Sequence, residues 1–328
     1  MSANEALTAS KGRDLGPLVG GAFAILAICA PLFLGDYALH AVIISLIFLL
    51  PAHGLNLLVG YTGLLSLAQA AFFGVGAYVS ALMATSWGAP FYLNLVGAAL
   101  AAATLALPLA VPALRLRATS FVMCTLGFVI IGQAIAKNWI SVTRGDMGLS
   151  AIPKPYFALG AGSFTISSTV AFYYLALAIA ALATLLVWMI VSSPAGRNMV
   201  AIRENETLAE SVGIPTWRYK LVVFVISAAF AGAGGSVYAH YLTVVSPLTF
   251  QMSYSTLMLI IVLGGGPGTI SGVVFGSFLF VGLSEALRIA PELRMIAYGC
   301  CLLALVFWFP KGFAPLIDRF WTLIRGRA

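Results

Sequence analysis

Long, uninterrupted runs of apolar residues fill most of the chain, and short polar segments separate them. Most runs approach the ~20 residues that a helix needs to cross a bilayer. The alternation of membrane barrels is absent, and a bilayer holds no water to satisfy an open backbone, so each run predicts a helix. The pattern predicts an all-α integral membrane protein, a polytopic bundle of about 9–10 transmembrane segments. The runs are 17–34, 38–59, 64–84, 91–114, 118–136, 169–191, 221–242, 253–263, 269–287 and 293–309.

The run at 253–263 is too short to cross a membrane without help, so it is either half of a broken helix or a re-entrant segment. Two glycine-rich segments also share one pattern, Gly-x-x-Gly-x-aliphatic-Ser followed by Phe-Gly. The two copies are 60–66 with 73–74, and 265–271 with 275–276. Matching interruptions of this kind are typical of a translocation site, although close packing of helices through small residues explains them equally well. The pattern predicts broken or re-entrant helices in two repeat-related halves.

Composition supports the membrane assignment. Hydrophobic residues make up 61% of the chain and charged residues only 8%, whereas a soluble fold needs far more polar surface. The net charge of +7 is not a nucleic-acid signal, because the basic residues lie between the spans, where orientation bias places them. The cysteines lie in apolar stretches without metal-ligand spacing, so we expect small buried hydrophobes and no metal site. They are Cys29, Cys124, Cys300 and Cys301.

A charged segment at residues 192–220 interrupts the apolar pattern. Pro194 suits the first turn of a helix, and Gly213 followed by Pro215 is typical of a helix end. The segment therefore predicts one or two short helices on the membrane surface. Such a segment either docks a partner in the water as a rigid lever or is a solvated connector without a partner. Its charged residues are Arg197, Arg203, Arg218, Lys220, Glu204, Glu206 and Glu210.

The distribution of Lys and Arg predicts the orientation of the chain. With residues 192–220 inside the cell and spans that alternate, twelve Lys and Arg residues lie inside and five outside, as the positive-inside rule requires. Both termini are then cytoplasmic. The expected organisation is a cytoplasmic tail at 1–16, a transmembrane permease domain at 17–309 with a cytoplasmic coupling loop at 192–220, and a cytoplasmic tail at 310–328. The external segment 137–168 is expected to be a loop with a short helix.

The sequence contains no phosphate-cradling loop, nucleophile elbow or zinc-protease motif, so we predict no enzyme and no cofactor. Ion-coupled carriers usually hold charged residues within the membrane, and these spans nearly lack them; a sodium carrier that uses carbonyls and hydroxyls stays open. His53 and His240 are either satisfied structural histidines or proton relays. Glu285 lies near a span end and close to Arg288, which suggests an interfacial ion pair. An active transporter without its own energy site must borrow energy from a separate ATPase.

Three stretches carry a specific resemblance to a known family. They are 54–72 (GLNLLVGYTGLLSLAQAAF), 196–235 with AIRENE and AESVGI, and 264–269 (GGGPGT). These stretches resemble the permeases of branched-chain amino acid ABC importers, and the similarity runs from about residue 42 to residue 309. The chain looks most like the LivM-type subunit of that family, from its length, its leading extra span and its AIRENE motif.

The resemblance implies a set of partners and a location. The partners are a second related permease of the LivH type, two cytoplasmic ATPase subunits, a periplasmic substrate-binding protein and membrane lipid. The location is the bacterial inner (plasma) membrane, and the cargo is leucine, isoleucine, valine or a related small solute. In this family the charged loop contacts the ATPase, which carries over to Arg203, Glu206, Glu210 and Gly213. Asn205 and Ser211 depart from the family pattern, where an acid and an alanine are usual.

Polar residues near the two glycine segments are candidates for lining the translocation path. Buried polar groups in a bilayer are costly unless they are paired or wetted, so they often line a cavity. Hydrogen bonding between helices is the other interpretation. The candidates are Asn56, Thr62, Ser66, Gln69, Thr269 and Ser271. The rival function for the whole chain is a stand-alone carrier or channel for a small neutral solute such as urea or an amide.

Overall fold

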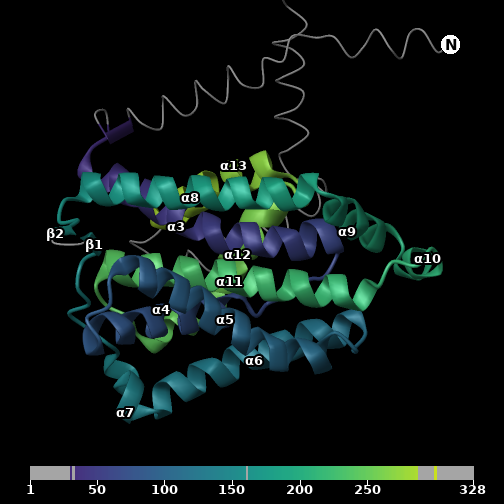
Figure 1. Ribbon diagram of the computed structural model, residues 1–328, viewed down its shortest axis with the longest axis horizontal. Helices are drawn as coiled ribbons and strands as arrows, with labels where there is room; N and C mark the ends of the chain where they lie inside the picture. The colour runs from purple at the N-terminus through teal and green to yellow at the C-terminus, as the bar shows by residue number, and fades with distance from the viewer. Residues whose placement is uncertain (1–29, 32–33, 160–161, 287–298, 301–328) are drawn as a thin grey trace, which may run out of the picture.

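A computed structural model describes residues 30–31, 34–159, 162–286 and 299–300. Within these residues the chain is helical apart from one short hairpin and the connecting loops. Figure 1 shows the long helices roughly side by side, with α3 and α11 in the middle and α6 and α8 at opposite edges. The predicted all-α polytopic membrane fold is confirmed. The expected tails and terminal spans lie almost wholly outside the described residues, at 1–16, 17–34, 293–309 and 310–328.

Two helices form the centre of the bundle. α3 (Asp36–Asn56) continues into a π-helix, η1 (Leu57–Thr62), and α11 covers Thr216–Leu242. In α3–η1, 89% of the residues in the most apolar stretch are buried, and in α11 the share is 61%. Helices that are apolar on all sides belong where protein surrounds them. The rest of the chain therefore shields these two helices from lipid.

Three further helices that are long and apolar enough to span lie around this centre. They are α5 (Phe91–Ala113), α6 (Ala118–Asn138) and α8 (Thr169–Ser192), and only 22%, 17% and 22% of their apolar stretches are buried. Their inner faces carry small residues, as in α5, where every fourth residue from Ala98 to Ala110 is a buried alanine. Small residues let helices approach closely in a membrane. The large aliphatic side chains point outward instead, as contact with lipid requires.

The described part of the bundle also contains three shorter apolar helices: α4 (Gln69–Ser86), α12 (Met252–Gly265) and α13 (Ile270–Ala286). α12 has 14 residues, and at ~1.5 Å per residue it falls well short of the ~30 Å hydrocarbon core. The short run at 253–263 is thus a half-length helix that joins α13 through a turn. The predicted start of α4 at residue 64 was wrong, because Gly63 leaves the helix with a φ of 74° and residues 63–67 are not helical, so that α4 begins only at Gln69.

The polar segments are structured at both ends of the bundle (Figure 1). At one end, residues 192–220 include two short helices, α9 and α10. At the other end, the predicted external loop contains short helices and an antiparallel hairpin that the apolar pattern did not predict. The elements are α9 (Pro194–Glu204), α10 (Glu206–Ser211), α7 (Ile140–Thr143), η2 (Gly145–Met147), β1 (Tyr156–Leu159), β2 (Gly162–Thr165) and η3 (Pro247–Phe250). In the hairpin Tyr156 lies opposite Thr165.

Small residues bring α4, α5 and α11 into direct contact. A Cβ atom at Gly76 of α4 would overlap the backbone of Gly232 in α11, and a Cβ at Gly232 would lie 2.6 Å from the Ala98 carbonyl oxygen in α5. The hydroxyl oxygens of Ser80 and Ser236 add a hydrogen bond of 2.8 Å between α4 and α11. The backbones of α4, α5 and α11 therefore pack directly against one another, with no side chain between them at these positions. Such close packing leaves the three helices little freedom to slide past one another.

Candidate functional site

The first glycine segment ends a long helix through a π-helical turn. In residues 57–62 the backbone bonds reach five residues back, an arrangement that is rare and often marks functional positions. The Thr62 hydroxyl donates to the Leu58 carbonyl at 2.7 Å. Gly63 then turns the chain with a φ of 74°, a value that suits glycine. The expected interruption is thus a π-helical turn followed by a non-helical link.

The second glycine segment separates α12 from α13. Gly266 and Gly268 have φ angles of 122° and 81°, which other residues rarely adopt. The Thr269 hydroxyl donates to the Gly266 carbonyl at 2.7 Å and closes the turn. Both glycine segments that the sequence singled out are therefore real breaks in helices.

The two breaks touch each other through the side chain of Asn56. Its Oδ1 accepts from the backbone N–H of Gly268 at 2.9 Å, and its Nδ2 donates to the Thr269 carbonyl at 3.2 Å. Asn56 is completely buried. A Cβ atom on Gly60 would overlap the backbone nitrogen of Gly268. We call this contact of Asn56, Gly60, Gly268 and Thr269 the glycine junction.

Arg203 reaches the glycine junction from the surface helix α9. Its Nη1 donates to the Gly60 carbonyl at 2.6 Å, and its Nη2 donates to Glu204 Oε1 at 2.9 Å. A Cβ on Gly63 would lie 3.2 Å from Arg203 Cγ, and one on Gly268 would lie 3.1 Å from Nη1. Hydrogen bonds from a charged donor are stronger than neutral ones. One side chain thus ties the charged loop to the breaks in the membrane helices.

Capping residues define the two helices of the charged loop. Ser193 begins α9 and accepts from a first-turn N–H at 3.2 Å, and Asn205 begins α10 and accepts from Leu208 N–H at 3.0 Å. Gly213 ends α10 with a φ of 88°, and the following N–H bonds back to α10 at 3.0 Å. Asn205, which departs from the family pattern, is therefore a helix cap. It stabilises the start of α10 by accepting a hydrogen bond, which needs no charge.

Acids of α10 fasten this helix to the start of α11. Glu206 forms an ion pair with Lys220. Glu210 Oε1 accepts from the Thr216 hydroxyl at 2.6 Å. Both partners lie in the first turns of α11, so a force applied to α10 is also applied to α11.

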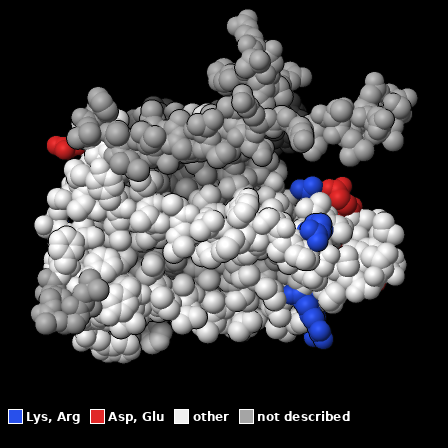
Figure 2. Space-filling model, turned by 45° about the horizontal axis from the view of Figure 1, so that its top comes forward, with Lys and Arg blue, Asp and Glu red and all other residues white. Residues whose placement is uncertain are grey.

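Two apolar side chains are exposed at the tip of the loop, among exposed polar residues. Leu208 is 63% exposed and Val212 is 70% exposed. Figure 2 shows Lys and Arg side chains, together with acids, gathered at the end of the molecule that carries α9 and α10, and white side chains over most of the rest of the visible face. The sequence analysis concentrated on charge and missed Leu208 and Val212. The sequence did hold a signal for them: two apolar residues stand four positions apart in an otherwise polar segment, so they share one face of a helix.

The predicted path residues divide between the glycine junction and ordinary helix packing. Asn56 and Thr269 lie at the junction. Gln69 is buried, and its Nε2 donates to a serine hydroxyl of α11 at 2.5 Å. The Ser66 hydroxyl is also buried and accepts from a backbone N–H at 3.2 Å, whereas Ser271 is exposed. The structure thus gathers part of the predicted set around Arg203.

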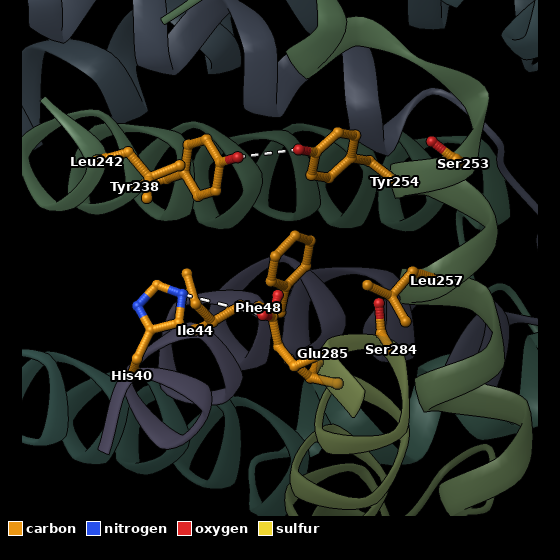
Figure 3. A pocket seen from close by; sticks show the side chains of 11 residues that line it. His40, Ile44, Phe48, Tyr238, Leu242, Ser253, Tyr254, Leu257, Ser284 and Glu285 are labelled. Carbon is orange, nitrogen blue, oxygen red and sulfur yellow. Dashed lines mark hydrogen bonds and ion pairs between the residues drawn. The ribbon is translucent and has the colours of Figure 1, made fainter. Parts of the chain in front are cut away.

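A cavity of about 150 Å³ lies at the end of the bundle opposite α9 and α10. Helices α3, α11, α12 and α13 form its walls. Figure 3 shows His40 and Glu285 on one side and the ring pair Tyr238 and Tyr254 on the other. His40 Nε2 lies 3.9 Å from Glu285 Oε2, and the two tyrosine hydroxyls are 2.9 Å apart. The walls therefore combine a carboxylate, an imidazole and hydroxyls with apolar side chains.

The sequence analysis missed this cavity. The predicted ion pair between Glu285 and Arg288 stays a prediction, because Arg288 lies outside the described residues. Within the described residues, Glu285 Oε2 lies 3.9 Å from His40 Nε2. A signal was present: His40, Ile44 and Phe48 follow one another at steps of four and share one face of α3. A histidine at the start of a helix, on the same face as apolar residues, is a signal for a polar cavity at that end of the helix.

The two histidines that the sequence did single out are hydrogen bonded. His53 Nε2 lies 2.9 Å from the Thr184 hydroxyl oxygen, and His240 Nδ1 lies 2.8 Å from the Pro153 carbonyl oxygen. Each bond connects elements that are distant in the sequence, so both histidines help to hold helices or loops together.

Residues 37–306 match the model of a family described as the permease component of branched-chain amino acid transport systems. The chain belongs to this permease family. LivM, the high-affinity branched-chain amino acid transport system permease protein of Escherichia coli K12, is 32% identical over 317 residues, which cover 90% of this chain and 74% of LivM. The predicted resemblance is therefore confirmed.

More distant relatives of this permease cover much of the chain as well. The corresponding LivH permease protein of Salmonella typhimurium LT2 is 27% identical over 282 residues, covering 81% of this chain and 90% of LivH. The guanosine ABC transporter permease protein NupQ of Bacillus subtilis 168 is 24% identical over 274 residues, covering 74% and 82%. Membership makes the chain a multi-pass membrane protein of a transport class not known for enzymatic activity. It favours an importer permease over a stand-alone carrier.

Proposed function

We propose that the chain is the permease subunit of an ABC importer and forms, with a second related permease of the LivH type, the passage for branched-chain amino acids. Leucine, isoleucine and valine are the expected cargo, with related small solutes as the wider class. The relatives support this choice, because the similarity to LivM, at 32% identity, exceeds the 24% identity to the guanosine permease NupQ. Two cytoplasmic ATPase subunits supply the energy, and a periplasmic binding protein delivers the solute.

We further propose that α9 and α10 lie in the cytoplasm together with both chain termini, in a bacterial inner membrane. The support is electrostatic. Exposed Arg115, Arg117, Arg197 and Arg218 belong to the segments expected on the cytoplasmic side, and basic residues favour that side of the membrane.

The bond from Arg203 to the Gly60 carbonyl is the observation that carries the mechanism. It joins α9, which an ATPase can push, to the π-turn at the end of the α3–η1 helix. Asn56 extends the connection to the start of α13. A shift of α9 therefore changes the hydrogen bonds of both breaks at once, and discrete rearrangements of this kind are how packed helices transmit motion.

The division of labour within the loop follows from burial. Leu208 and Val212 expose the apolar area that a partner can cover, and apolar anchors usually dominate an interface. Glu206 and Glu210 brace α10 against α11, and Gly213 permits the turn between them. We propose that these braces, together with Arg203, transmit the movement of the ATPase.

Co-purification from cells that express the chain with its neighbouring genes tests this function. We expect the unsubstituted chain to bring down a second permease and ATPases, and the double variant Leu208→Asp, Val212→Asp to lose the ATPases. Met147→Asp, at a 90% exposed apolar residue on the opposite end, is the matched control and should keep them. Arg203→Ala should keep the ATPases and their hydrolysis but lose leucine uptake.

Two outcomes would contradict the proposal. Recovery of the ATPases with the double variant would show that the contact lies elsewhere. A chain that purifies alone and moves a neutral solute in vesicles without ATP would establish the rival function, a stand-alone carrier or channel.

A further inference from the structure

We propose that residues 63–67, which we call the hinge segment, are where the permease moves α6, and that Thr125 of α6 and Ser255 of α12 are the positioning residues that hold them. This inference rests on the proposed function and names the element that carries a shift of the glycine junction further into the membrane. The hinge segment directly follows the π-helical turn whose Gly60 carbonyl is held by Arg203.

Two different helices hold the peptide groups of Leu67. Its N–H donates to the Thr125 hydroxyl of α6 at 3.2 Å, and its carbonyl accepts from the Ser255 hydroxyl of α12 at 2.6 Å. The same Ser255 oxygen accepts from the N–H of Ala70, in the first turn of α4, at 2.9 Å. Backbone outside a helix needs such partners at membrane depth, because no water is there to satisfy it. Two hydroxyl groups therefore fix the hinge segment between α4, α6 and α12.

Both hydroxyls use their single proton within these contacts. Thr125 is completely buried and donates to the Val122 carbonyl at 2.8 Å, so it can act toward Leu67 only as an acceptor. Ser255 is also buried, and its proton goes to the Leu67 carbonyl. Removal of either oxygen leaves a buried backbone group of Leu67 without its partner, which is costly. The position of the hinge segment therefore depends on these two oxygen atoms.

An unsatisfied acceptor lies just beyond the hinge segment. Gln69, the first residue of α4, is buried, and its Nε2 donates to the Ser227 hydroxyl of α11 at 2.5 Å. Its Oε1 has no hydrogen-bond partner among the described residues. A buried polar group without a partner raises the free energy of the arrangement that contains it. A second arrangement that brings a donor to Gln69 relieves this cost, so the hinge segment is suited to switch between two arrangements.

Helix α12 connects the hinge segment to the glycine junction. Ser255 lies in its first turn, and Gly265 at its other end packs so closely on α13 that a Cβ atom would overlap the Gly272 carbonyl. The stretch from Ser255 to Gly265 is about 15 Å long. Its side chains at Met258 and Ile261 are completely buried, which keeps the helix in place between its neighbours. A shift at the glycine junction therefore reaches the hinge segment through one short helix.

Helix α6 is the element that can respond. Among the five long apolar helices of the described residues it has the smallest buried share, 17%. Rings form part of its contacts with α4 and α11: the centroids are 5.6 Å apart for Phe72 and Phe128, and 6.0 Å for Phe121 and Phe224. Contacts between side chains adjust by small rotations, whereas the backbone contacts of α4, α5 and α11 do not. A pull at Thr125 therefore moves α6 against a fixed block.

Distances between spin labels measure this movement directly. The four native cysteines are replaced by alanine, and labels are attached to Met123→Cys with Leu182→Cys, or to Leu100→Cys with Leu182→Cys. These exposed residues belong to α6, α8 and α5, and α6 and α8 lie at opposite edges of the bundle (Figure 1). The chain is expressed with its neighbouring genes, and labelled complexes that import leucine are compared without nucleotide and after trapping with ATP and vanadate. We expect trapping to change the distance from α6 to α8 and to leave the distance from α5 to α8 unchanged.

Variants of the two hydroxyls connect the movement to transport. Thr125→Val keeps the shape of the side chain and should abolish the distance change, with about tenfold lower leucine uptake at unchanged ATP hydrolysis. Thr125→Ser should restore both. Ser255→Ala should act like Thr125→Val, and the double variant should lose no more than either, because both release the same residue. Ser80→Ala removes a buried hydrogen bond inside the fixed block and should change neither quantity.

The outcomes separate the hinge from the proposed function. If the complex imports leucine and the distance from α6 to α8 does not change, the hinge is wrong and the function stands. If Ser80→Ala loses as much uptake as Thr125→Val, or if the losses add in the double variant, the two hydroxyls only support packing. If no ATPase is recovered or no branched-chain amino acid is imported, the function and the hinge fail together. If Thr125→Val does not reach the membrane, Ser255→Ala decides the same question.

Discussion

At the end of the bundle that carries α9 and α10, the important contacts run through backbone atoms. Arg203 holds the Gly60 carbonyl, Asn56 holds the backbone of Gly268, and no space remains for a Cβ atom at Gly60. At the opposite end, the cavity walls are side chains, and its polar contacts join a histidine to a glutamate and a tyrosine to another tyrosine. The same helices α3, α12 and α13 take part in both ends.

This difference has a physical consequence. A backbone contact allows no substitution that adds an atom, whereas a wall of side chains accepts changes of size and polarity at modest cost. Substitutions at the two ends should therefore differ in size: a large loss of stability and coupling at the glycine junction, and a small loss of stability at the cavity wall.

The largest effect is expected for Gly60→Ala. The added methyl group would overlap the backbone of Gly268, and separating the breaks should lower the free energy of unfolding by about 3 kcal/mol. Leucine uptake should fall with it. Gly282→Ala in α13 is the control, because a Cβ there meets nothing within 4 Å. The midpoints of thermal unfolding in detergent are compared for the two variants. Equal midpoints would show that the glycine junction is not tightly packed.

Asn56→Leu should have the next largest effect. It leaves the buried N–H of Gly268 and the carbonyl of Thr269 without their partner, a loss of about 2–4 kcal/mol. Asn56→Asp keeps the acceptor for Gly268 and loses only the donor to Thr269, so it should lose less. The order of the two unfolding midpoints tests the assignment, and the reverse order would contradict it.

Arg203→Lys should change coupling more than stability. Lysine keeps the charge but lacks the planar fork that bonds Gly60 and Glu204 together. Loss of one charged hydrogen bond corresponds to about tenfold in uptake at unchanged ATP hydrolysis. Arg197→Lys, an exposed residue of the same helix, should transport normally. If Arg203→Lys loses ATP hydrolysis and uptake together, Arg203 is needed to bind the ATPase and not to transmit its movement to the membrane helices.

The smallest effect is expected for Ile44→Val in the cavity wall. Removal of one methylene should lower the free energy of unfolding by about 1 kcal/mol and leave maximal uptake unchanged. Thermal unfolding in detergent and leucine uptake measure the two quantities. A loss of stability as large as that of Gly60→Ala would show that the cavity wall is packed as tightly as the glycine junction.

Periodicity and composition were sufficient to predict the long helices of the described residues and the charged loop, although not the exact start of α4 or the hairpin. Hydropathy identified the spans, because helix formation in a bilayer depends on a local run of apolar residues. Gly63 and Gly268 marked the two breaks, since their backbone angles suit glycine and few other residues. Gly213 marked the end of α10 for the same reason. These features depend on neighbours within a few positions, so the amino-acid sequence by itself determined them.

Only the tertiary structure decided which of these pieces meet. Arg203 and Gly60 are 143 residues apart, and Asn56 and Gly268 are 212 apart, so no local pattern predicts their bonds. The roles of Glu206 and Glu210 as braces, and the cavity at Glu285, depend likewise on how separate helices pack. The residues next to a charged side chain in the sequence do not show whether that side chain contacts a partner protein or another part of its own chain. Packing settles that choice, because the number of buried groups that must be satisfied at once leaves few arrangements open.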